Sequence, residues 1–388
     1  GRTLDGATII GKPTSGTVYA TGILNAFSST CNIVSGSIED CSTAIQNDKG
    51  DVNMSGGVIT NCRYGIDLNH SEANTLIISG GTISNCSEEG IKLGDKGNLN
   101  MTALPVFSDN TTDIKIRDQK KIIFGAGTYT APTSPITVKV YYSGTDPYVF
   151  TEGYSPNVKD GNDVIAFSDV FNVTIQNQAE NATLSFFGEA VIAGPKTFYF
   201  ADSQVWSTWC DKYEWNIPEG IEVYEVTGVS NRNVGIQQLS ATTIPAYKPV
   251  LLKKKDSGSL EAKATIAGVG AAPDNYDEDE RVVTNTVGDA TLVGTTQNAD
   301  EWEMGGYYTY NKTYILYNNE FMLIYSNDGL AAHKFWINMD IDGAKDDDEK
   351  YCSRSMSIGG DGTTGINSVE HLEFRDESWY SLDGRKLV

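Results

Sequence analysis

The charged side chains that could support catalysis in this sequence are few. Cleavage of a glycosidic bond needs two carboxyl groups at a set separation, and lyase chemistry needs a base beside a Ca²⁺-holding or otherwise charge-stabilising cluster. The nearest approach is a scattered group of charged residues: Asp67, Lys92, Asp109, Asp113, Lys115 and Arg117. Isolated charges of this kind usually form a solvated surface. We therefore predict no catalytic residue and no enzyme activity.

One segment has the spacing of a calcium-binding loop. Four oxygen-bearing residues, Asn338, Asp340, Asp342 and Glu349, match the ligand positions of an EF-hand loop. The first position is Asn rather than Asp, the eighth is Lys345 where that loop wants an apolar residue, and the preceding segment has a strand pattern. We interpret the segment as a solvated acidic turn. No metal and no cofactor is expected.

The cysteines and histidines do not form a recognisable reactive group. Cys41, Cys62 and Cys86 occupy equivalent positions of a repeat, which favours a buried column of thiols. One disulfide between two of them is the alternative. Cys210 and Cys352 pair or stay free. The histidines, His70, His333 and His371, are far apart in the sequence, and no Gly-x-Ser-x-Gly elbow accompanies them.

Three tryptophans are the candidate binding residues. Trp206, Trp209 and Trp215 lie close together in a segment with strand patterns. Aromatic rings on an exposed face can stack against a ligand, whereas the same residues in strands are more often part of a core. We retain these three as candidate binding residues, for a glycan or for a host-matrix protein.

The elements that would position these residues begin with a repeat between Asn32 and Ile116. The sequence Ser-Gly-Gly-Thr-Ile-Ser-Asn-Cys ending at Cys86 repeats Ser-Gly-Gly-Val-Ile-Thr-Asn-Cys ending at Cys62, with looser copies ending at Cys41 and Asn110. The four positions are 21, 24 and 24 residues apart. Three residues before each position stands an apolar residue: Ile38, Ile59, Ile83 and Phe107.

This period predicts a right-handed parallel β-helix. An α-solenoid repeat needs about 33 residues, whereas short β-branched runs separated by Gly, Asn and Ser indicate strands and turns. One coil cannot bury its apolar side alone, so neighbouring coils stack and share a core. Ile38, Ile59, Ile83 and Phe107 are then expected to form one interior column.

Composition limits the function classes. The chain has 388 residues, which favours two or more domains. Its net charge of −22 argues against nucleic acid and against anionic membrane surfaces as partners. No apolar run approaches the length of a membrane span. The chain begins with Gly1 rather than Met, so we interpret it as a processed piece from which a signal segment is absent.

The Ser-Gly-Gly-x-Ile-x-Asn-Cys repeat followed by Gly-Ile resembles the β-helical repeats of surface proteins from Bacteroidetes and other gut bacteria. The stretch 244–252, Ile-Pro-Ala-Tyr-Lys-Pro-Val-Leu-Leu, is similar to part of a C-terminal β-module of secreted Bacteroidetes proteins. The stretch 379–388 resembles the start of their C-terminal secretion-type hairpin. The resemblance implies an extracellular or cell-surface protein related to adhesion.

We therefore predict an all-β chain. Residues 1–194 form the parallel β-helix with capping coils, residues 195–360 form an antiparallel β-sandwich-like module, and residues 361–388 form a tail with a partial hairpin. The segment from Asp274 to Arg281 is expected to be a solvated loop.

Three functions fit this organisation. The first is non-enzymatic adhesion or binding of a glycan or a host-matrix protein by a monomer. The second is a carbohydrate-active β-helix enzyme, either polysaccharide lyase or glycoside hydrolase, or its ancillary domain. The third is a purely structural passenger. Clustered carboxylates in one groove would favour the enzyme, and exposed aromatics on one face would favour binding.

Overall fold

The structure is a computed structural model, and it describes residues 2–11, 20–68, 72–117, 119–144, 146–176, 181–230, 233–279, 281–288, 290–296, 313–324, 333–339, 355–359, 379–380 and 386–387. The chain divides into two compact units, Gly1–Gly194 and Pro195–Val388. The fold is all-β, with only two short helices among the described residues, α1 (Tyr154–Asn157) and α2 (Phe167–Val170). The prediction of an all-β chain is confirmed.

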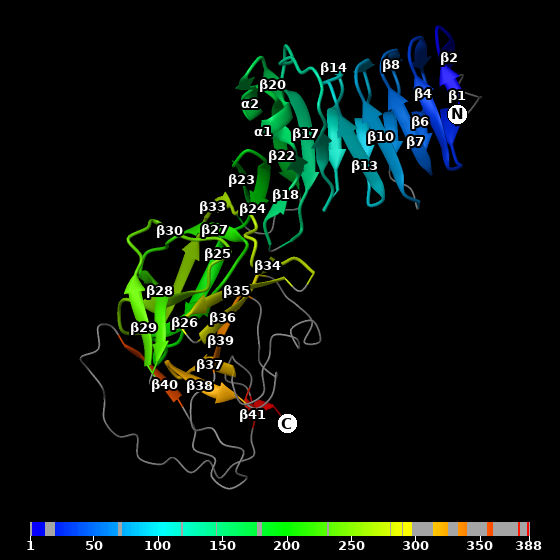
Figure 1. The fold of residues 1–388 in the computed structure, drawn as a ribbon. Helices are drawn as coiled ribbons and strands as arrows, with labels where there is room; N and C mark the ends of the chain where they lie inside the picture. The colour runs from blue at the N-terminus through cyan, green and yellow to red at the C-terminus, as the bar shows by residue number, and fades with distance from the viewer. Residues whose placement is uncertain are drawn as a thin grey trace. The chain divides into compact units, whose positions relative to one another are not determined.

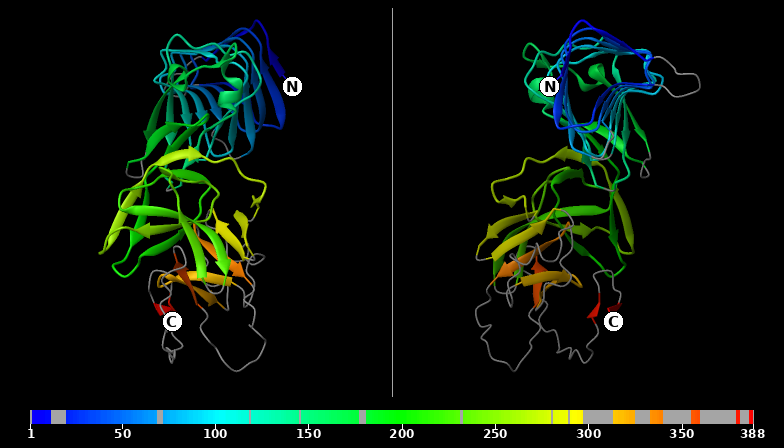
Figure 2. Two further views of the ribbon diagram at one scale, coloured as in Figure 1. Left: turned by 60° about the vertical axis from the view of Figure 1, so that its left-hand side comes forward. Right: turned by 90° about the vertical axis from the view of Figure 1, so that its right-hand side faces the viewer.

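The first unit is a parallel β-solenoid of about five turns (Figures 1 and 2). Sheet one contains β1 (Arg2–Leu4), β4 (Ser29–Ile33), β7 (Gly50–Met54), β10 (Asn74–Ile78), β13 (Gly97–Met101), β16 (Ile122–Phe124) and β19 (Thr151–Glu152). Sheet two contains β2 (Thr8–Ile10), β5 (Ser37–Glu39), β8 (Val58–Thr60), β11 (Thr82–Ser84) and β14 (Val106–Ser108). Sheet three contains β3 (Thr21–Asn25), β6 (Thr43–Asn47), β9 (Tyr64–Leu68), β12 (Glu89–Leu93), β15 (Thr112–Ile116), β17 (Ile136–Tyr141) and β22 (Phe171–Gln176).

The repeat forms this solenoid because its residue types suit a coil that turns sharply. Gly57 and Gly81 have φ angles of 78° and 96°, a region that side chains with a Cβ rarely adopt. Asn61 and Asn85, just before the cysteines, have φ angles of 52°, and Asn tolerates this left-handed conformation better than most residues. The repeat therefore contains the residue types that these turns require, and the turns set the length of each coil.

The interior column predicted from the repeat is confirmed. Ile59 pairs with Ile38 on one side and with Ile83 on the other, and Ile83 pairs with Phe107. The three isoleucines are 0% exposed, and Phe107 is partly buried against the same core. Burial of such a side chain contributes about 1.5–3 kcal/mol to stability, so the column is a main source of cohesion between coils.

The cysteines of the repeat form a second buried column of free thiols. Each thiol donates to the carbonyl oxygen two residues before it, at 3.2 Å for Cys41, 3.3 Å for Cys62 and 3.8 Å for Cys86. Burial raises the pKa of Cys62 to about 12 and that of Cys86 to about 11. The thiolate, which is the reactive form, is therefore suppressed in this column.

Aromatic residues close the C-terminal end of the solenoid. Phe124, Tyr154, Phe167 and Phe171 pack edge-on or tilted, with Phe124 and Tyr154 centroids 5.2 Å apart. The same end contains β18 (Tyr148–Val149), β20 (Lys159–Asp160), β21 (Asp163–Val164), β23 (Thr183–Phe186) and β24 (Ala190–Ala193). The last coils thus replace the aliphatic column by larger side chains, as expected for a solenoid end.

The second unit contains a mixed sheet of eleven strands. Their order is β26 (Trp206–Trp209), β31 (Val250–Lys254), β28 (Ile221–Ser230), β29 (Asn233–Gln238), β40 (Ser355–Gly359), β38 (Glu320–Ile324), β37 (Thr313–Tyr317), β39 (Phe335–Met339), β36 (Ala290–Thr295), β35 (Val282–Val287) and β34 (Tyr276–Asp277). Most pairs are antiparallel, but β29 and β40 are parallel. The structure therefore shows a β-rich unit with mixed sheets, and it supports the predicted antiparallel sandwich only in part.

Three smaller sheets complete the strand inventory of the described residues. One pairs β25 (Lys196–Phe200) with β32 (Leu260–Ala264), and another contains β30 (Thr243–Ile244), β27 (Tyr213–Asn216) and β33 (Ile266–Val269). The third pairs β41 (Trp379–Tyr380) with β42 (Lys386–Leu387). We expected residues 274–281 to form a solvated loop. This prediction is wrong in part, since Tyr276 and Asp277 form strand β34, which pairs with β35.

Candidate ligand-binding site

The charged residues of the solenoid form ion pairs between neighbouring coils. The Lys92 ammonium lies 3.4 Å from Asp67 Oδ2, and the Lys115 ammonium donates to Glu89 Oε1 at 2.8 Å. Both pairs join strands of sheet three that are adjacent in space. Each cation thus neutralises an acid on the preceding coil.

The two aspartates considered for catalysis have different surroundings. Asp113 is buried, and its carboxylate accepts hydrogen bonds from the Thr137 amide and hydroxyl at 2.8 Å and from Asn110 Nδ2 at 2.9 Å. Asp109 is exposed at a turn with a φ of 55°. Arg117 pairs instead with Asp95, at 3.1 Å. The structure does not bring these residues together as an acid and base pair.

The three candidate tryptophans have unequal access to solvent. Trp215 is 0% exposed and Trp209 is 5% exposed, and both rings face protein side chains. Trp206 is partly exposed at the edge strand of the large sheet, where its ring meets Tyr224 edge-on with centroids 5.2 Å apart. Of the three, only Trp206 presents part of its ring to solvent.

The buried tryptophans belong to a polar cluster around Asp211. Trp215 Nε1 donates to Asp211 Oδ2 at 3.0 Å, and His333 Nδ1 lies 3.4 Å from the same oxygen. The His333 ring stacks on Trp209 with centroids 5.2 Å apart. Burial raises the pKa of Asp211 to about 6, and the charge of Lys196 opposes this shift. The cluster joins β26, β27 and the residues before β39, which is a structural role.

The candidate calcium-binding segment begins inside β39, and only its first two residues, Asn338 and Met339, are described. Asn338 Oδ1 accepts a hydrogen bond from Thr313 Oγ1 at 2.7 Å within the large sheet. Asp340, Asp342 and Glu349 lie outside the described residues, as do His70, His371 and Cys352. Within the described part of the chain no three His, Cys, Asp or Glu side chains are grouped so that they could hold a metal ion.

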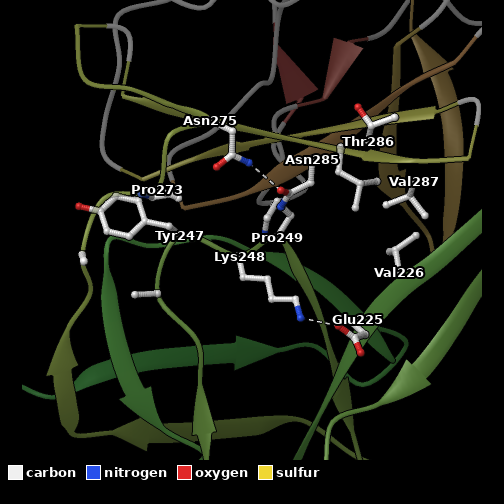
Figure 3. A pocket seen from close by; sticks show the side chains of 13 residues that line it. Glu225, Val226, Tyr247, Lys248, Pro249, Pro273, Asn275, Asn285, Thr286 and Val287 are labelled. Atoms are coloured by element: carbon white, nitrogen blue, oxygen red, sulfur yellow. Dashed lines mark hydrogen bonds and ion pairs between the residues drawn. The ribbon is translucent and has the colours of Figure 1, made fainter.

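A cavity of about 450 Å³ lies in the second unit (Figure 3). Its walls come from segments far apart in the sequence. Strand β28 contributes Glu225 and Val226, and the segment before β31 contributes residues 246–249. Residues 271, 273 and 275 and part of β35 and β36 form the opposite side. This volume lies within the range of about 300–1,000 Å³ that is typical of small-molecule sites.

Polar groups line the cavity at two places. Lys248 Nζ donates to Glu225 Oε2 on one wall, and both side chains keep access to solvent, with 43% and 29% exposed. On the facing wall Asn275 Nδ2 donates to Asn285 Oδ1 at 2.8 Å (Figure 3). The same nitrogen donates to the carbonyl oxygen of Thr284 at 2.6 Å. Two amides and one ion pair therefore face a space whose remaining lining is largely apolar.

Tyr247 is the aromatic residue of the cavity wall. Its φ is 52°, a left-handed conformation that costs a bulky residue about 1–3 kcal/mol. The backbone N–H of Tyr247 donates to the Asp211 carbonyl oxygen at 2.6 Å, and its ring meets Tyr276 edge-on with centroids 4.8 Å apart. Burial raises its pKa to about 12, with Tyr276 and Glu278 adding to the effect, so the phenol is neutral at pH 7.

Sequence reasoning missed this cavity, although one signal pointed near it. Residues 246–249 belong to the stretch that most specifically resembles a β-module of secreted proteins, but the resemblance assigned them no role. Asn275 falls in the segment expected to be a solvated loop. Strand order alone brings these residues opposite Glu225, and that order was not predictable from the local pattern.

Comparisons with family models, with curated proteins and with solved structures find no match for this chain. Among the described residues no helix has the length and apolar character needed to cross a membrane.

Proposed function

We propose that this protein is a non-enzymatic binding protein whose cavity takes a neutral sugar unit of a glycan. The observation that carries the proposal is the combination of Tyr247, the Lys248–Glu225 pair and the Asn275–Asn285 amides around one cavity. Binding sites for small molecules are mostly apolar with a few well-placed polar groups, as this cavity is.

The chemistry of the wall suits sugar hydroxyls. A hydroxyl both donates and accepts hydrogen bonds, so one group can accept from Lys248 while its neighbour donates to Glu225. The amides offer the same two functions on the facing wall. The Tyr247 ring supplies an apolar surface for the C–H face of a pyranose. Glu225 disfavours an acidic sugar at this position, because two carboxylates would repel.

The alternatives have weaker support. Glycoside hydrolysis needs two carboxyl groups on opposite sides of the bond, and Glu225 is the sole acid among the described residues that line the cavity. A purely structural passenger does not require a solvent-accessible cavity lined by an ion pair and two amides. The proposal also includes a cell-surface or secreted location and adhesion of the Bacteroidetes type. It further includes a right-handed solenoid and a sandwich-like second unit.

The experiment compares the full chain with matched variants on an array of neutral and acidic oligosaccharides, with hits measured by calorimetry. Tyr247→Asn removes the ring but suits the left-handed backbone, so folding is retained. We expect it to weaken binding of the neutral hits at least tenfold, while a cooperative melting transition shows that the fold is kept despite the lost ring contact with Tyr276. Tyr199→Ala, at an exposed tyrosine outside the cavity, is the control and should bind normally.

Two results would contradict the proposal. One is full binding by both Tyr247→Asn and Glu225→Gln, which would place the ligand elsewhere. The other is release of sugar products from plant, host or microbial polysaccharides by the wild-type chain. If that turnover disappears in Glu225→Gln, Asp109→Asn or Asp113→Asn, the chain is an enzyme.

A further inference from the structure

Three lysines form a column on the outer face of sheet three in the solenoid. Lys92, Lys115 and Lys139 lie on β12, β15 and β17, and the strand register places Lys92 beside Lys115 and Lys115 beside Lys139. Neighbouring strands are about 4.8 Å apart. Like charges directly opposite one another destabilise a sheet, so three in a row need compensation.

The compensation stops before the third lysine. Asp67 lies beside Lys92, and Glu89 accepts from Lys115, as described above. Among the described residues Lys139 has no ion-pair partner, and the residue beside it on β22 is Thr174. Positive charge therefore remains at the β17 end of the column. This local excess stands out in a chain whose net charge is −22.

A cation and an aromatic ring flank this end of the column. Ile116 and Val140 are the last paired residues of β15 and β17, and Arg117 and Tyr141 follow them directly in the sequence. Tyr141 is 37% exposed, and Arg117 is exposed while it pairs with Asp95. A ligand that crosses β15 and β17 meets two ammonium groups, and the edge of this path offers a guanidinium and a phenol.

We propose that this face binds an anionic polysaccharide whose carboxylates or sulfates lie along the lysine column, across the strands. The repeat of one cation per coil suits a linear polymer with regularly spaced charges. The partly exposed carboxylate of Asp67 can accept a hydrogen bond from one of its hydroxyls. This site belongs to the solenoid and is independent of the neutral-sugar cavity in the second unit.

A glycan fits the face better than nucleic acid does. Proteins that bind single-stranded nucleic acid combine a basic groove with several aromatic residues on which successive bases stack. Here one aromatic residue, Tyr141, accompanies the column, and the acids Asp67 and Glu89 pair with Lys92 and Lys115. A single-stranded nucleic acid would find a cation at Lys139 but little base stacking, whereas a polysaccharide needs no stacked bases.

The test measures binding of the full chain to polygalacturonate and to heparin at low salt, with dextran and single-stranded poly-dT as comparison polymers. Lys139→Gln should weaken binding of the acidic polysaccharide about tenfold, the effect of one charge-assisted hydrogen bond. It should also reduce the salt dependence, because fewer counterions are released per bound chain. Lys121→Gln, at an exposed lysine beside sheet one, is the control and should bind like the wild type.

Four results would overturn the inference. These are absence of binding to both acidic polysaccharides, equal binding of dextran, equal binding of poly-dT, and equal weakening by Lys121→Gln and Lys139→Gln. Tyr247→Asn should leave polygalacturonate binding unchanged, and Lys139→Gln should leave neutral-sugar binding unchanged. Failure at one site is therefore distinguishable from failure at the other.

Discussion

Replacement of Lys334 by methionine should stabilise the second unit at pH 7. Lys334 lies just before β39, and its ammonium donates to Ser207 Oγ at 2.7 Å. Burial lowers its pKa from 10.5 to about 8. The protonated lysine thus has a higher free energy in the folded state than in the unfolded chain. Methionine keeps much of the side-chain volume and removes the charge.

The magnitude follows from the pKa difference. A shift of about 2.5 units corresponds to about 3 kcal/mol of unfavourable free energy in the folded state when the lysine is protonated. Loss of the hydrogen bond to Ser207 offsets about 1 kcal/mol of the gain. The net stabilisation is then about 2 kcal/mol, or a rise of about 4–8 °C in melting temperature for a unit of this size.

The pH dependence gives the sharper result. Between pH 8 and 10.5 the Lys334 side chain binds a proton in the unfolded chain but not in the folded one, so its contribution to stability rises with pH in this window. Below pH 8 Lys334 is protonated in both the folded and the unfolded state, so the whole unfavourable free energy of its charge is present. The advantage of Lys334→Met should therefore be largest at pH 7 and should shrink toward pH 10.5.

Differential scanning calorimetry of the full chain at several pH values between 7 and 10.5 measures this difference. The comparison of wild type and variant cancels the tyrosines and cysteines, which titrate in the same range. Lys255→Met, at an exposed lysine of the same unit, should change neither the melting temperature nor its pH dependence. The reasoning would be refuted if Lys334→Met melts no higher than wild type at pH 7, or if its advantage is constant with pH.

Three further predictions concern the solenoid and metal dependence. Ile83→Asp should prevent cooperative folding of the first unit, because it buries an unpaired charge at a cost above about 4 kcal/mol, whereas Val58→Asp on the outer face should fold; circular dichroism melting separates the two. Gly65→Ala should lower the melting temperature strongly, since a Cβ there would lie 2.3 Å from the Gly90 carbonyl oxygen, whereas Gly194→Ala meets nothing within 4 Å and should melt normally. Excess chelator should leave melting unchanged; a fall of many degrees that Ca²⁺ restores would assign a metal role to Asp340, Asp342 and Glu349.

Much of the first unit could be predicted from sequence because its contacts repeat at a fixed interval. Ile59 contacts residues one repeat before and one repeat after it, so the spacing of Ile38, Ile59 and Ile83 contains the tertiary pairing. The left-handed turns at Asn61 and Asn85 are equally local, because residue type limits which φ angles are accessible.

The tryptophans show where this reasoning ends. Trp206, Trp209 and Trp215 lie within ten positions of one another in similar strand patterns, yet Trp215 is fully buried and Trp206 is partly exposed. The difference depends on what packs against each ring. His333 reaches Trp209 from a distant part of the chain, and no local pattern predicts that contact. Asp211 is only four positions from Trp215, but the sequence alone does not show that its carboxylate accepts the indole hydrogen bond.

The sequence by itself determined the all-β class, the stacked coils and the buried isoleucine and cysteine columns. These features depend on contacts between equivalent positions of neighbouring repeats. The residue types and the period of the repeat are therefore enough to predict them. Only the tertiary structure decided the cavity around Tyr247 and the partial burial of Lys334. In the second unit the strands pair across long and irregular sequence separations. Glu225, Lys248 and Asn285 become neighbours only when the large sheet has formed, because the order of its strands, not the local sequence, sets which side chains face one another.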